Sequence, residues 1–356
     1  MKRLLMITPA RPAGAVGGRE QLSALHERCL SELLGDGFAV HRLQPCPPTG
    51  LRGTIAALAG SIDGVTAASI RDVLELIAND GVDELWLDGS NLGRLAAAVR
   101  RGAPGVTIST FAHNVEARFF LGGLRHRPGP HSLAVLLANW AAERLAVRHS
   151  DRLIALSERE SALFRRLYRR PASNLLPMAI EDRFTGAIVW APTTGGLLFV
   201  GGAFYANLNG MRWFAANVAP RIDVVTRVVG RGFEAYHDEL AAAGKVDIVG
   251  AVADLAPYYA AASAVIAPIF DGSGMKTKVA EALMHGKQVI GTKEAFTGYE
   301  GIGAGVRCDT REAFIAAIRR LTADPAPRFD PALRALYEAH FSPQALRRQL
   351  KTILGA

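Results

Sequence analysis

The sequence contains few cysteines, and their spacing narrows the redox setting and the metals that the chain can bind. Among its 356 residues only Cys29, Cys46 and Cys308 are cysteines, and they are scattered without a disulfide-like pairing or a zinc-ligand spacing. Structural disulfides belong to oxidising compartments, so we expect a reducing, cytoplasmic location. Because zinc sites need clustered Cys or His ligands, we predict no metal site.

Long apolar runs are also absent. No stretch reaches the roughly 20 apolar residues that a membrane-spanning helix requires. The first apolar residues end at Thr8 and Pro9, so we interpret residues 4–7 as a first strand and not as the core of a secretion signal. With 49% hydrophobic and 21% charged residues, the composition is that of a globular protein without a disordered tail.

The net charge of +8 raises the question of a nucleic-acid partner. The basic residues are spread out, and only 7% of residues are aromatic, so no cluster resembles a single-strand binding groove and we predict no nucleic acid. The densest basic stretch, residues 165–170, follows an amphipathic helix. It is either a solvated helix end, where cations suit the helix dipole, or a contact with an anionic membrane surface.

Short apolar strands alternate with amphipathic helices along the chain, which is typical of parallel sheets built from βαβ units. Because 356 residues exceed one ordinary α/β domain, we predict a domain at residues 1–180, a linker at 181–195 rich in Gly, Pro and Thr, and a domain at 196–341. The predicted strands are residues 4–7, 39–43, 84–87, 107–111, 152–155, 174–177, 196–200, 224–229, 246–248, 264–267 and 289–291.

The most informative segment is residues 263–290, where a strand, a glycine loop and a helix follow one another. The loop contains Gly272 and Gly274, the helix begins near Met275 and ends near Met284, and Gly286 suits the position after its cap. Backbone N–H groups at such a helix start, together with the helix dipole, favour an anion.

Three charged residues sharpen this interpretation. Lys276 and Lys278 place positive charge in the first turn, and Glu281 lies one turn further on, within reach of a hydroxyl group. A phosphate that carries a hydroxyl-bearing group, such as a nucleotide, would satisfy all three. The alternative is an ordinary glycine turn with solvated lysines, in which Glu281 pairs with Lys278 at i, i+3 on the surface.

Several segments, taken together, resemble the retaining glycosyltransferases of the GT-B fold, in particular the large group 1 family, also called family 4. The segments are residues 198–210, 229–232 and 248–255, followed by the glycine-loop segment, with residues 16–20 and 111–117 in the first half. The resemblance implies an α/β protein with two facing, doubly wound Rossmann-like domains and an interdomain cleft. It also implies that the last helix, within residues 342–356, crosses back to the N-terminal domain.

The same resemblance implies the site residues. His113, Arg231 and Lys276 would be catalytic, with Arg231 neutralising the diphosphate and Glu281 holding the ribose hydroxyls. The substrate would be a UDP- or GDP-linked sugar, with no cofactor and no metal. The donor site would consist of Gly18, Gly201, Gly202, Arg231, Ser273, Gly274, Met275, Lys276, Lys278 and Glu281.

Two positions depart from the family pattern. The family commonly has a Glu eight residues before the ribose glutamate, where this chain has Ser273. The usual Arg and Lys after the first strand of the second domain are also missing, since residues 203–210 offer Tyr205, Asn207 and Asn209 instead. We therefore expect Lys276 or Lys278 to supply part of the charge that neutralises the phosphates.

The predicted function is transfer of a sugar, with retention, to a hydroxyl of a glycan or lipid-linked acceptor in the assembly of a bacterial cell-surface polysaccharide or glycolipid. The protein would work in the cytoplasm or at the inner face of the membrane. Two alternatives remain open, namely an epimerase or phosphorylase on the same fold, and an inactive regulator that binds nucleotide-sugar or glycan. A dehydrogenase is disfavoured, because residues 14–18 lack the Gly-x-Gly-x-x-Gly spacing.

Overall fold

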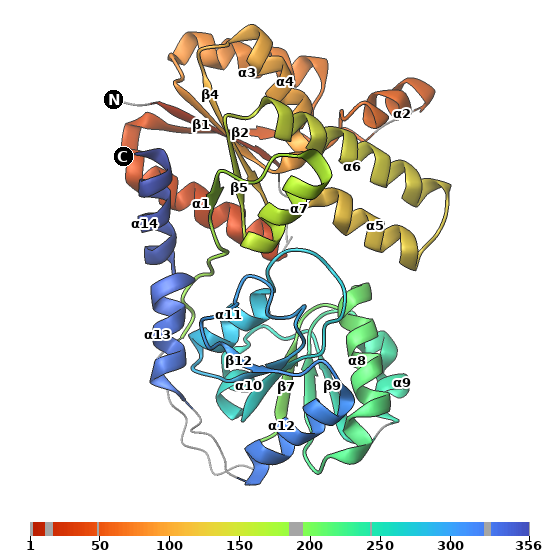
Figure 1. The fold of residues 1–356 in the computed structure, drawn as a ribbon. Coiled ribbons are helices and arrows are strands. Elements are labelled where there is room, and N and C mark those ends of the chain that lie inside the picture. Colours follow the sequence, from red (N-terminus) through yellow and green to blue (C-terminus); the bar gives the residue numbers. More distant parts are fainter. Residues whose placement is uncertain are drawn as a thin grey trace. The chain divides into compact units, whose positions relative to one another are not determined.

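The computed structural model describes residues 3–10, 17–47, 50–184, 195–242, 244–323 and 329–355. The chain divides into two compact units, one formed by Met1–Met178 with Leu346–Ala356 and the other by Ala179–Ala345. Each unit contains a six-stranded parallel sheet (Figure 1). Of the predicted linker, residues 185–194 lie outside the described residues.

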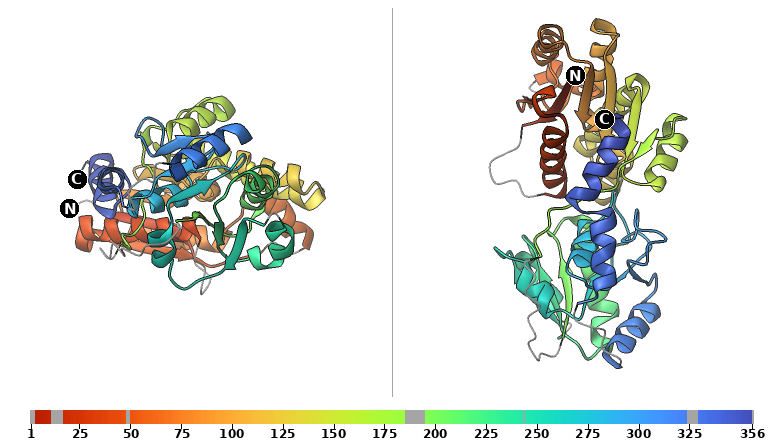
Figure 2. Two further views of the ribbon diagram at one scale, coloured as in Figure 1. Left: turned by 90° about the horizontal axis from the view of Figure 1, so that it is seen from below. Right: turned by 90° about the vertical axis from the view of Figure 1, so that its left-hand side faces the viewer.

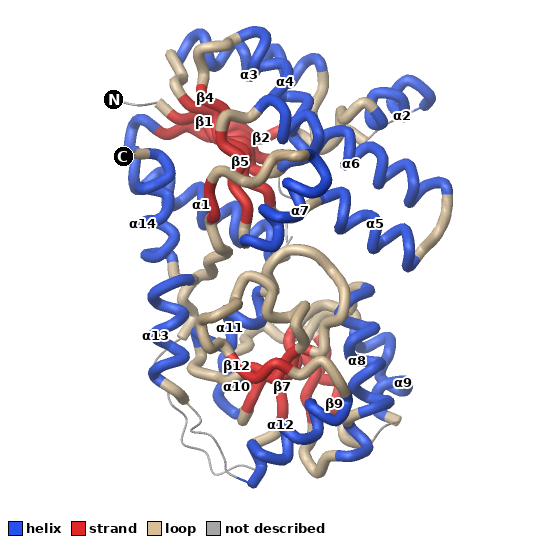
Figure 3. Tube along the Cα trace, viewed as in Figure 1, coloured by secondary structure: helices blue, strands red, loops and turns tan. Residues whose placement is uncertain are grey.

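In the first unit the sheet has the order β2-β1-β3-β4-β5-β6 (strands red in Figure 3). The direction of winding reverses between β1 and β3, and such switch points are where open α/β sheets bind ligands, at the carboxyl ends of the strands. The predicted strands of this unit are found, with ends that differ by no more than two residues. They are β1 (Leu4–Pro9), β2 (Phe38–Leu43), β3 (Glu84–Asp88), β4 (Thr107–Ala112), β5 (Arg152–Ala155) and β6 (Asn174–Leu175).

Helices cover both sides of this sheet, as right-handed crossovers in opposite directions require. The right-hand view of Figure 2 shows α1, in dark red, and α7, in yellow-green, on opposite sides. Most of α14 belongs to this unit, where Arg347 Nη1 lies 2.8 Å from Glu32 Oε2 of α1. The helices are α1 (Gly18–Leu34), α2 (Gly50–Leu58), α3 (Ala67–Asp80), α4 (Gly93–Gly102), α5 (Glu116–His126), α6 (Pro130–His149), α7 (Glu158–Tyr168) and α14 (Pro343–Leu354), with short 3-10 turns η1 (Gly35–Gly37) and η2 (Ser90–Leu92).

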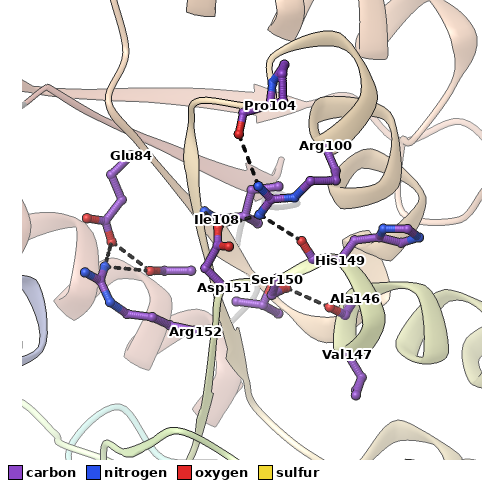
Figure 4. Close-up of polar contacts among 12 residues, drawn as sticks. Glu84, Arg100, Pro104, Ile108, Ala146, Val147, His149, Ser150, Asp151 and Arg152 are labelled. Carbon is purple, nitrogen blue, oxygen red and sulfur yellow. Dashed lines mark hydrogen bonds and ion pairs between the residues drawn. The ribbon is translucent and has the colours of Figure 1, made fainter.

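Apolar and polar contacts fix the register of this sheet. Leu5, Leu85 and Ile108, from three adjacent strands, are at most 2% exposed and lie in one core cluster. At the amino ends of the strands, the buried carboxylate of Glu84 accepts hydrogen bonds from Arg152 Nη1 at 2.6 Å and from Ser109 Oγ at 2.7 Å (Figure 4). These contacts stabilise the end of the sheet opposite to the switch point.

The second unit has the sheet order β12-β11-β10-β7-β8-β9, so its winding reverses between β7 and β10. Strand β12 was not predicted, because its three residues are all exposed and have no apolar pattern. The strands are β7 (Leu197–Val200), β8 (Thr226–Val229), β9 (Val246–Gly250), β10 (Ala264–Ala267), β11 (Val289–Gly291) and β12 (Gly305–Arg307). The helices are α8 (Tyr205–Asn217), α9 (His237–Ala241), α10 (Ala256–Ala261), α11 (Thr277–Met284), α12 (Arg311–Ala323) and α13 (Pro331–His340), with 3-10 turns η3 (Ala219–Arg221) and η4 (Phe233–Tyr236).

Candidate functional site

The glycine loop of the second unit lies between β10 and α11. Gly272 and Gly274 have φ angles of +126° and +68°, which side chains other than glycine rarely adopt. Helix α11 begins at Thr277, two residues later than predicted, with Lys276 as its N-cap. The helix ends at Met284, and Gly286 follows with a φ of +60°, so the predicted helix end is confirmed.

Lys278 is buried, which excludes the solvated alternative for this lysine. Lys278 is only 6% exposed. Its Nζ donates a hydrogen bond to Asn207 Oδ1 at 2.7 Å and lies 4.1 Å from the ring centroid of Phe199. Asn207 Nδ2 in turn donates to the carbonyl of Gly202 at 2.7 Å. A Cβ on Gly201 would lie 3.2 Å from Lys278 Nζ. The structure therefore brings Gly201, Gly202 and Lys278 together at the carboxyl end of β7.

Among the residues that the structure describes, the hydrogen-bond partner of the Lys278 ammonium group is the Asn207 amide oxygen and not a carboxylate. Burial and, to a smaller extent, the positive charge of Lys276 lower the pKa of Lys278 to about 7, with the negative charge of Glu281 opposing them. A buried cation with such a pKa gains stability from any anion that comes within reach. The site next to Gly201 is therefore prepared for a negatively charged group.

Lys276 is turned differently, toward its own loop. Its Nζ donates to the carbonyls of Gly274 at 2.8 Å and Ser273 at 3.2 Å, and lies 3.3 Å from Glu294 Oε1. These contacts fix the carbonyls of the glycine loop and thereby orient the opposite, N–H side of its peptides. Met275, also predicted in the donor site, is buried at 7% exposure, and Ser273 is half-buried.

Glu281 is half-buried on α11, between the buried residues Ala280 and Ala282. Its Oε2 accepts a hydrogen bond from the hydroxyl of Tyr259 at 3.0 Å. Burial raises the pKa of the Glu281 carboxyl, and the Tyr259 hydrogen bond opposes that effect. The alternative in which Glu281 and Lys278 form an ion pair on the surface is therefore not supported, because Lys278 is buried and donates its hydrogen bond to Asn207.

Arg231 is exposed in the turn after β8. Its carbonyl accepts a hydrogen bond from the N–H of Ala203 at 3.0 Å, which joins this turn to the Gly201–Gly202 turn after β7. Gly232 beside it has a φ of +88°, a conformation that suits glycine. Arg231 and the glycines therefore lie on adjacent turns at the carboxyl edge, next to the switch point between β7 and β10.

His113 lies in the first unit, directly after β4, and is 5% exposed. Its Nε2 lies 2.8 Å from Oδ1 of buried Asp88, whose Oδ2 accepts from Thr8 Oγ1 at 2.7 Å. Burial raises the pKa of Asp88, but the His113 imidazole and the Thr8 hydroxyl, which both donate hydrogen bonds to the carboxylate, outweigh it, so the net direction is downward. Asp88 is thus a carboxylate, and the His113 Nε2–H donates to it.

The neutral form of His113 is favoured. Burial lowers the pKa of its imidazole, and the neighbouring carboxylate of Asp88 opposes that effect without reversing it. With Nε2 carrying the proton, Nδ1 is the nitrogen left to accept a hydrogen bond. The pair fits both a catalytic histidine and a structural histidine that is already satisfied.

The loop that carries His113 is held by Glu143, a residue that sequence reasoning missed. The buried carboxylate of Glu143, on α6, accepts from the backbone N–H groups of Glu116 at 2.7 Å and Ala117 at 3.1 Å, at the start of α5. It also accepts from Ser90 Oγ at 3.2 Å and Tyr168 Oη at 2.5 Å. The available signal was the single acidic residue of α6, a helix rich in alanine and leucine.

Glu116 is the second buried carboxyl near this loop, at 4% exposure. Burial, together with the negative charges of Glu143 and Asp63, raises its pKa to about 7, with the positive charge of Arg19 opposing this. Arg19 itself donates from Nη2 to Asn91 Oδ1 at 3.3 Å. Gly18, which opens α1, is exposed, and the preceding residues 11–16 lie outside the described part of the chain.

The raised pKa of Glu116 makes folding stability depend on pH. The folded state binds the proton up to about pH 7 and the unfolded state only up to about 4.5, so the free energy of unfolding falls as pH rises through that window. We expect Glu116→Gln to raise the free energy of unfolding at pH 8 by about 2 kcal/mol and to change it little at pH 4. Urea unfolding at both pH values measures this. An equal effect of the exposed first-turn control Glu158→Gln would contradict it.

Comparison with known proteins agrees with this architecture. Residues 5–178 match the model of the "glycosyl transferase 4-like domain" and residues 194–324 that of "glycosyl transferases group 1". A search of curated proteins returns no match to this chain.

Solved structures share the fold over the whole chain. Sucrose-phosphate synthase from Thermosynechococcus elongatus has a TM-score of 0.73 at 16% identity, covering 100% of this chain and 98% of that one. HepE from Anabaena, in complex with UDP and glucose, has a TM-score of 0.66 at 15% identity and full coverage of both chains. The lipopolysaccharide outer core galactosyltransferase WaaB has a TM-score of 0.63 at 12% identity, covering 100% and 99%.

The two parallel-sheet units and these matches define a glycosyltransferase of the GT-B fold. Within that class, its C-terminal half carries a group 1 domain and its N-terminal half a family 4-like domain. Among the described residues, no cluster of His, Cys, Asp and Glu has the make-up of a metal site. No described helix has the length and apolarity to span a bilayer.

Proposed function

We propose that this glycosyltransferase moves a sugar from a UDP- or GDP-linked donor to a hydroxyl group of a glycan or lipid-linked acceptor, with retention of configuration. The observation that carries the donor site is the buried Lys278 beside the Gly201–Gly202 turn, with exposed Arg231 on the adjacent turn and Glu281 one turn along α11. Positive charge, close backbone approach and a carboxylate are what a nucleoside diphosphate needs.

In this proposal each residue of the donor site contacts a different part of the donor or of the glycine loop. Arg231 and Lys278 neutralise the charge that develops on the leaving diphosphate, an electrostatic effect worth several kcal/mol for well-placed donors. Lys276 holds the carbonyls of Gly274 and Ser273, so that the loop N–H groups are available to the donor. Glu281 accepts the ribose hydroxyls. No metal takes part in this scheme.

The transfer step forms a bond between the acceptor oxygen and the anomeric carbon and breaks the bond from that carbon to the phosphate oxygen. Attack occurs on the face from which the phosphate leaves, and a phosphate oxygen takes the acceptor proton, so retention needs no protein nucleophile. His113 contributes Nδ1 as a hydrogen-bond acceptor for a sugar hydroxyl, with its orientation fixed by Asp88.

The biological setting we propose is assembly of a bacterial cell-surface polysaccharide or glycolipid in the cytoplasm or at the inner, anionic face of the membrane. The similarity to a lipopolysaccharide outer core galactosyltransferase and to HepE, whose structures hold UDP or UDP-glucose, supports this direction. Ser273, in place of the family's sugar-contacting Glu, favours a second candidate, a regulator that binds nucleotide-sugar without turnover.

The experiment that tests the donor site is a thermal-shift comparison of UDP, GDP, ADP and NAD without added metal. Saturable stabilisation by UDP or GDP alone supports the proposal and names the base. No shift with any of the four nucleotides would overturn the donor site. A shift with UDP or GDP in a protein that transfers no sugar would favour the regulator.

Lys278 makes donor binding sensitive to pH. Because the pKa of Lys278 is about 7 before the donor binds, Lys278 is largely neutral at pH 8. A diphosphate binds the charged form, so at higher pH binding must be accompanied by uptake of a proton. We expect affinity for UDP-glucose, or GDP-glucose if GDP is the better ligand, to fall about fivefold from pH 7 to pH 8. Calorimetry in buffers of different ionisation enthalpy measures both affinity and proton uptake. Lys278→Met should abolish the pH dependence, and a pH-independent wild type would contradict the assignment.

A further inference from the structure

The exposed apolar side chains of the protein are concentrated on two helices. Of the eleven large hydrophobic residues that are exposed in the described part of the chain, six belong to α2 or α6. They are Leu51 (77%), Ile55 (59%), Leu58 (39%), Leu133 (46%), Leu137 (42%) and Trp140 (40%). Single exposed hydrophobics need no explanation, whereas a concentration of this kind marks an interaction surface.

Each helix presents these residues as a regular row. On α6 the exposed positions 133, 137, 140, 144 and 148 follow helical spacing, while Ala138, Ala142 and Ala146 are buried. On α2 the exposed row is 51, 55 and 58, and Ala57 is buried. The end of α2 meets α6 closely, since a Cβ on Gly60 would lie 3.1 Å from Ala142 Cα (Figure 1).

Every exposed charged side chain on α2, α5 and α6 is positive. Helix α5 packs along α6, and the only acidic residues of the three helices, Glu116 and Glu143, are buried. The Arg144 guanidinium lies 5.7 Å from the ring centroid of Trp140, where cation and aromatic ring meet at the surface. The exposed basic residues on and next to these helices are Arg52, Arg125, Arg127, Arg144 and Arg148.

We propose that the α2–α6 surface, defined by the two apolar rows and these five arginines, binds the surface of an anionic lipid bilayer. Apolar rows that enter the headgroup region, flanked by arginines and an interfacial Trp, are the chemistry of a peripheral membrane contact. A second copy of the same surface is disfavoured, because it would bring positive charge onto positive charge. This surface would be the membrane contact of the proposed function. Its lipid binding can be measured whether or not the proposed sugar transfer is correct, and only its biological role rests on that function.

The basic stretch at residues 165–170 is less suited to this role. Arg170 is used within the fold, where Nη1 donates to the carbonyl of Ser150 at 2.7 Å and Nη2 to that of Asp151 at 2.9 Å. Only Leu167, at 47% exposure, provides a large exposed apolar side chain there. This stretch therefore serves as the matched control.

Co-sedimentation of the full chain with vesicles tests the proposal. The probes are vesicles of phosphatidylcholine alone and of phosphatidylcholine with about one third phosphatidylglycerol, at low and high salt. We expect wild type to bind the anionic vesicles at least about tenfold more tightly than the neutral ones, with the difference reduced by salt. We expect the affinity to fall at least about tenfold when the two rows are made polar. The substitutions are Leu51→Gln, Ile55→Gln, Leu58→Gln, Leu133→Gln, Leu137→Gln and Trp140→Gln.

The control variant combines Arg165→Gln, Arg166→Gln and Leu167→Gln and should bind vesicles as wild type does. Loss of binding in this control with retention in the six-residue variant, or no preference of wild type for anionic vesicles, would overturn the proposal. Self-association of wild type without lipid, abolished in the six-residue variant, would instead identify a second copy as the occupant. Nucleotide thermal shifts are measured on the same variants, so that the two proposals are tested separately. If vesicle binding is intact and no nucleotide stabilises the protein, only the proposed function is contradicted.

Discussion

Replacing His113 by alanine is expected to lower the turnover number of sugar transfer by about 10²–10³-fold, the effect of losing one preorganised hydrogen-bonding group, while leaving nucleotide affinity nearly unchanged. His113 is buried after β4 and its Nε2–H donates to the Asp88 carboxylate at 2.8 Å, so its orientation and tautomer are fixed before any substrate arrives. The nucleotide site that we propose, in contrast, consists mainly of residues of the second unit. Turnover with radiolabelled donor and nucleotide affinity by calorimetry, on the same preparation, measure the two effects.

Two further variants separate catalysis from folding. Asp88→Asn should lower turnover in the same direction, because an amide in place of the carboxylate no longer fixes the tautomer of the ring. His149→Ala, which removes a half-buried histidine at the end of α6, should leave turnover unchanged. A fully active and normally folded His113→Ala enzyme would show that His113 is a structural histidine.

Replacing Glu281 by alanine is expected to weaken nucleotide binding by about ten- to a hundredfold, the value of hydrogen bonds to a charged group. Glu281 is half-buried on α11, and its Oε2 already accepts a hydrogen bond from Tyr259 at 3.0 Å, which fixes the carboxylate in position for the ribose hydroxyls that we propose it binds. Calorimetric titration with the nucleotide that shifts the melting temperature measures the loss.

Two comparisons distinguish direct contact of Glu281 with the nucleotide from the support that Tyr259 gives to Glu281. Tyr259→Phe removes only the anchoring hydroxyl and should weaken binding less than Glu281→Ala, because the carboxylate remains. A nucleoside diphosphate whose ribose lacks the 2′-hydroxyl should lose affinity with wild type and lose none with Glu281→Ala. Unchanged nucleotide affinity in Glu281→Ala would remove this residue from the donor site.

The sequence predicted the strands well because a parallel strand buried on both sides is a short, continuous apolar run. The runs at residues 152–155, 264–267 and 289–291 coincide with β5, β10 and β11. Strand β12 lacks such a run and was missed. The start of α11 was placed two residues early, because the Gly274–Lys276 turn continues the glycine loop before helical geometry begins.

The sequence indicated which residues form the candidate site, but only part of the contacts that these residues make. Gly286 and the glycine loop follow from local backbone chemistry, which a sequence displays directly. The partner of Lys278 is Asn207, 71 residues away, and the partner of His113 is Asp88, 25 residues away, so only the fold reveals them. The same distance in sequence hid the role of Glu143 at the start of α5.

The anchoring of α5 by Glu143 has a consequence for how this protein can diversify. Glu143 holds the start of α5 through the main-chain N–H groups of Glu116 and Ala117. Any residue except proline supplies such a group, so this anchor does not depend on which side chains stand at positions 116 and 117, although both positions are buried and accept only side chains that fit there. Substitutions at the exposed end of α5, at Arg125 and His126, can then be accepted while the anchor at the start of the helix, and with it the loop that carries His113, is kept.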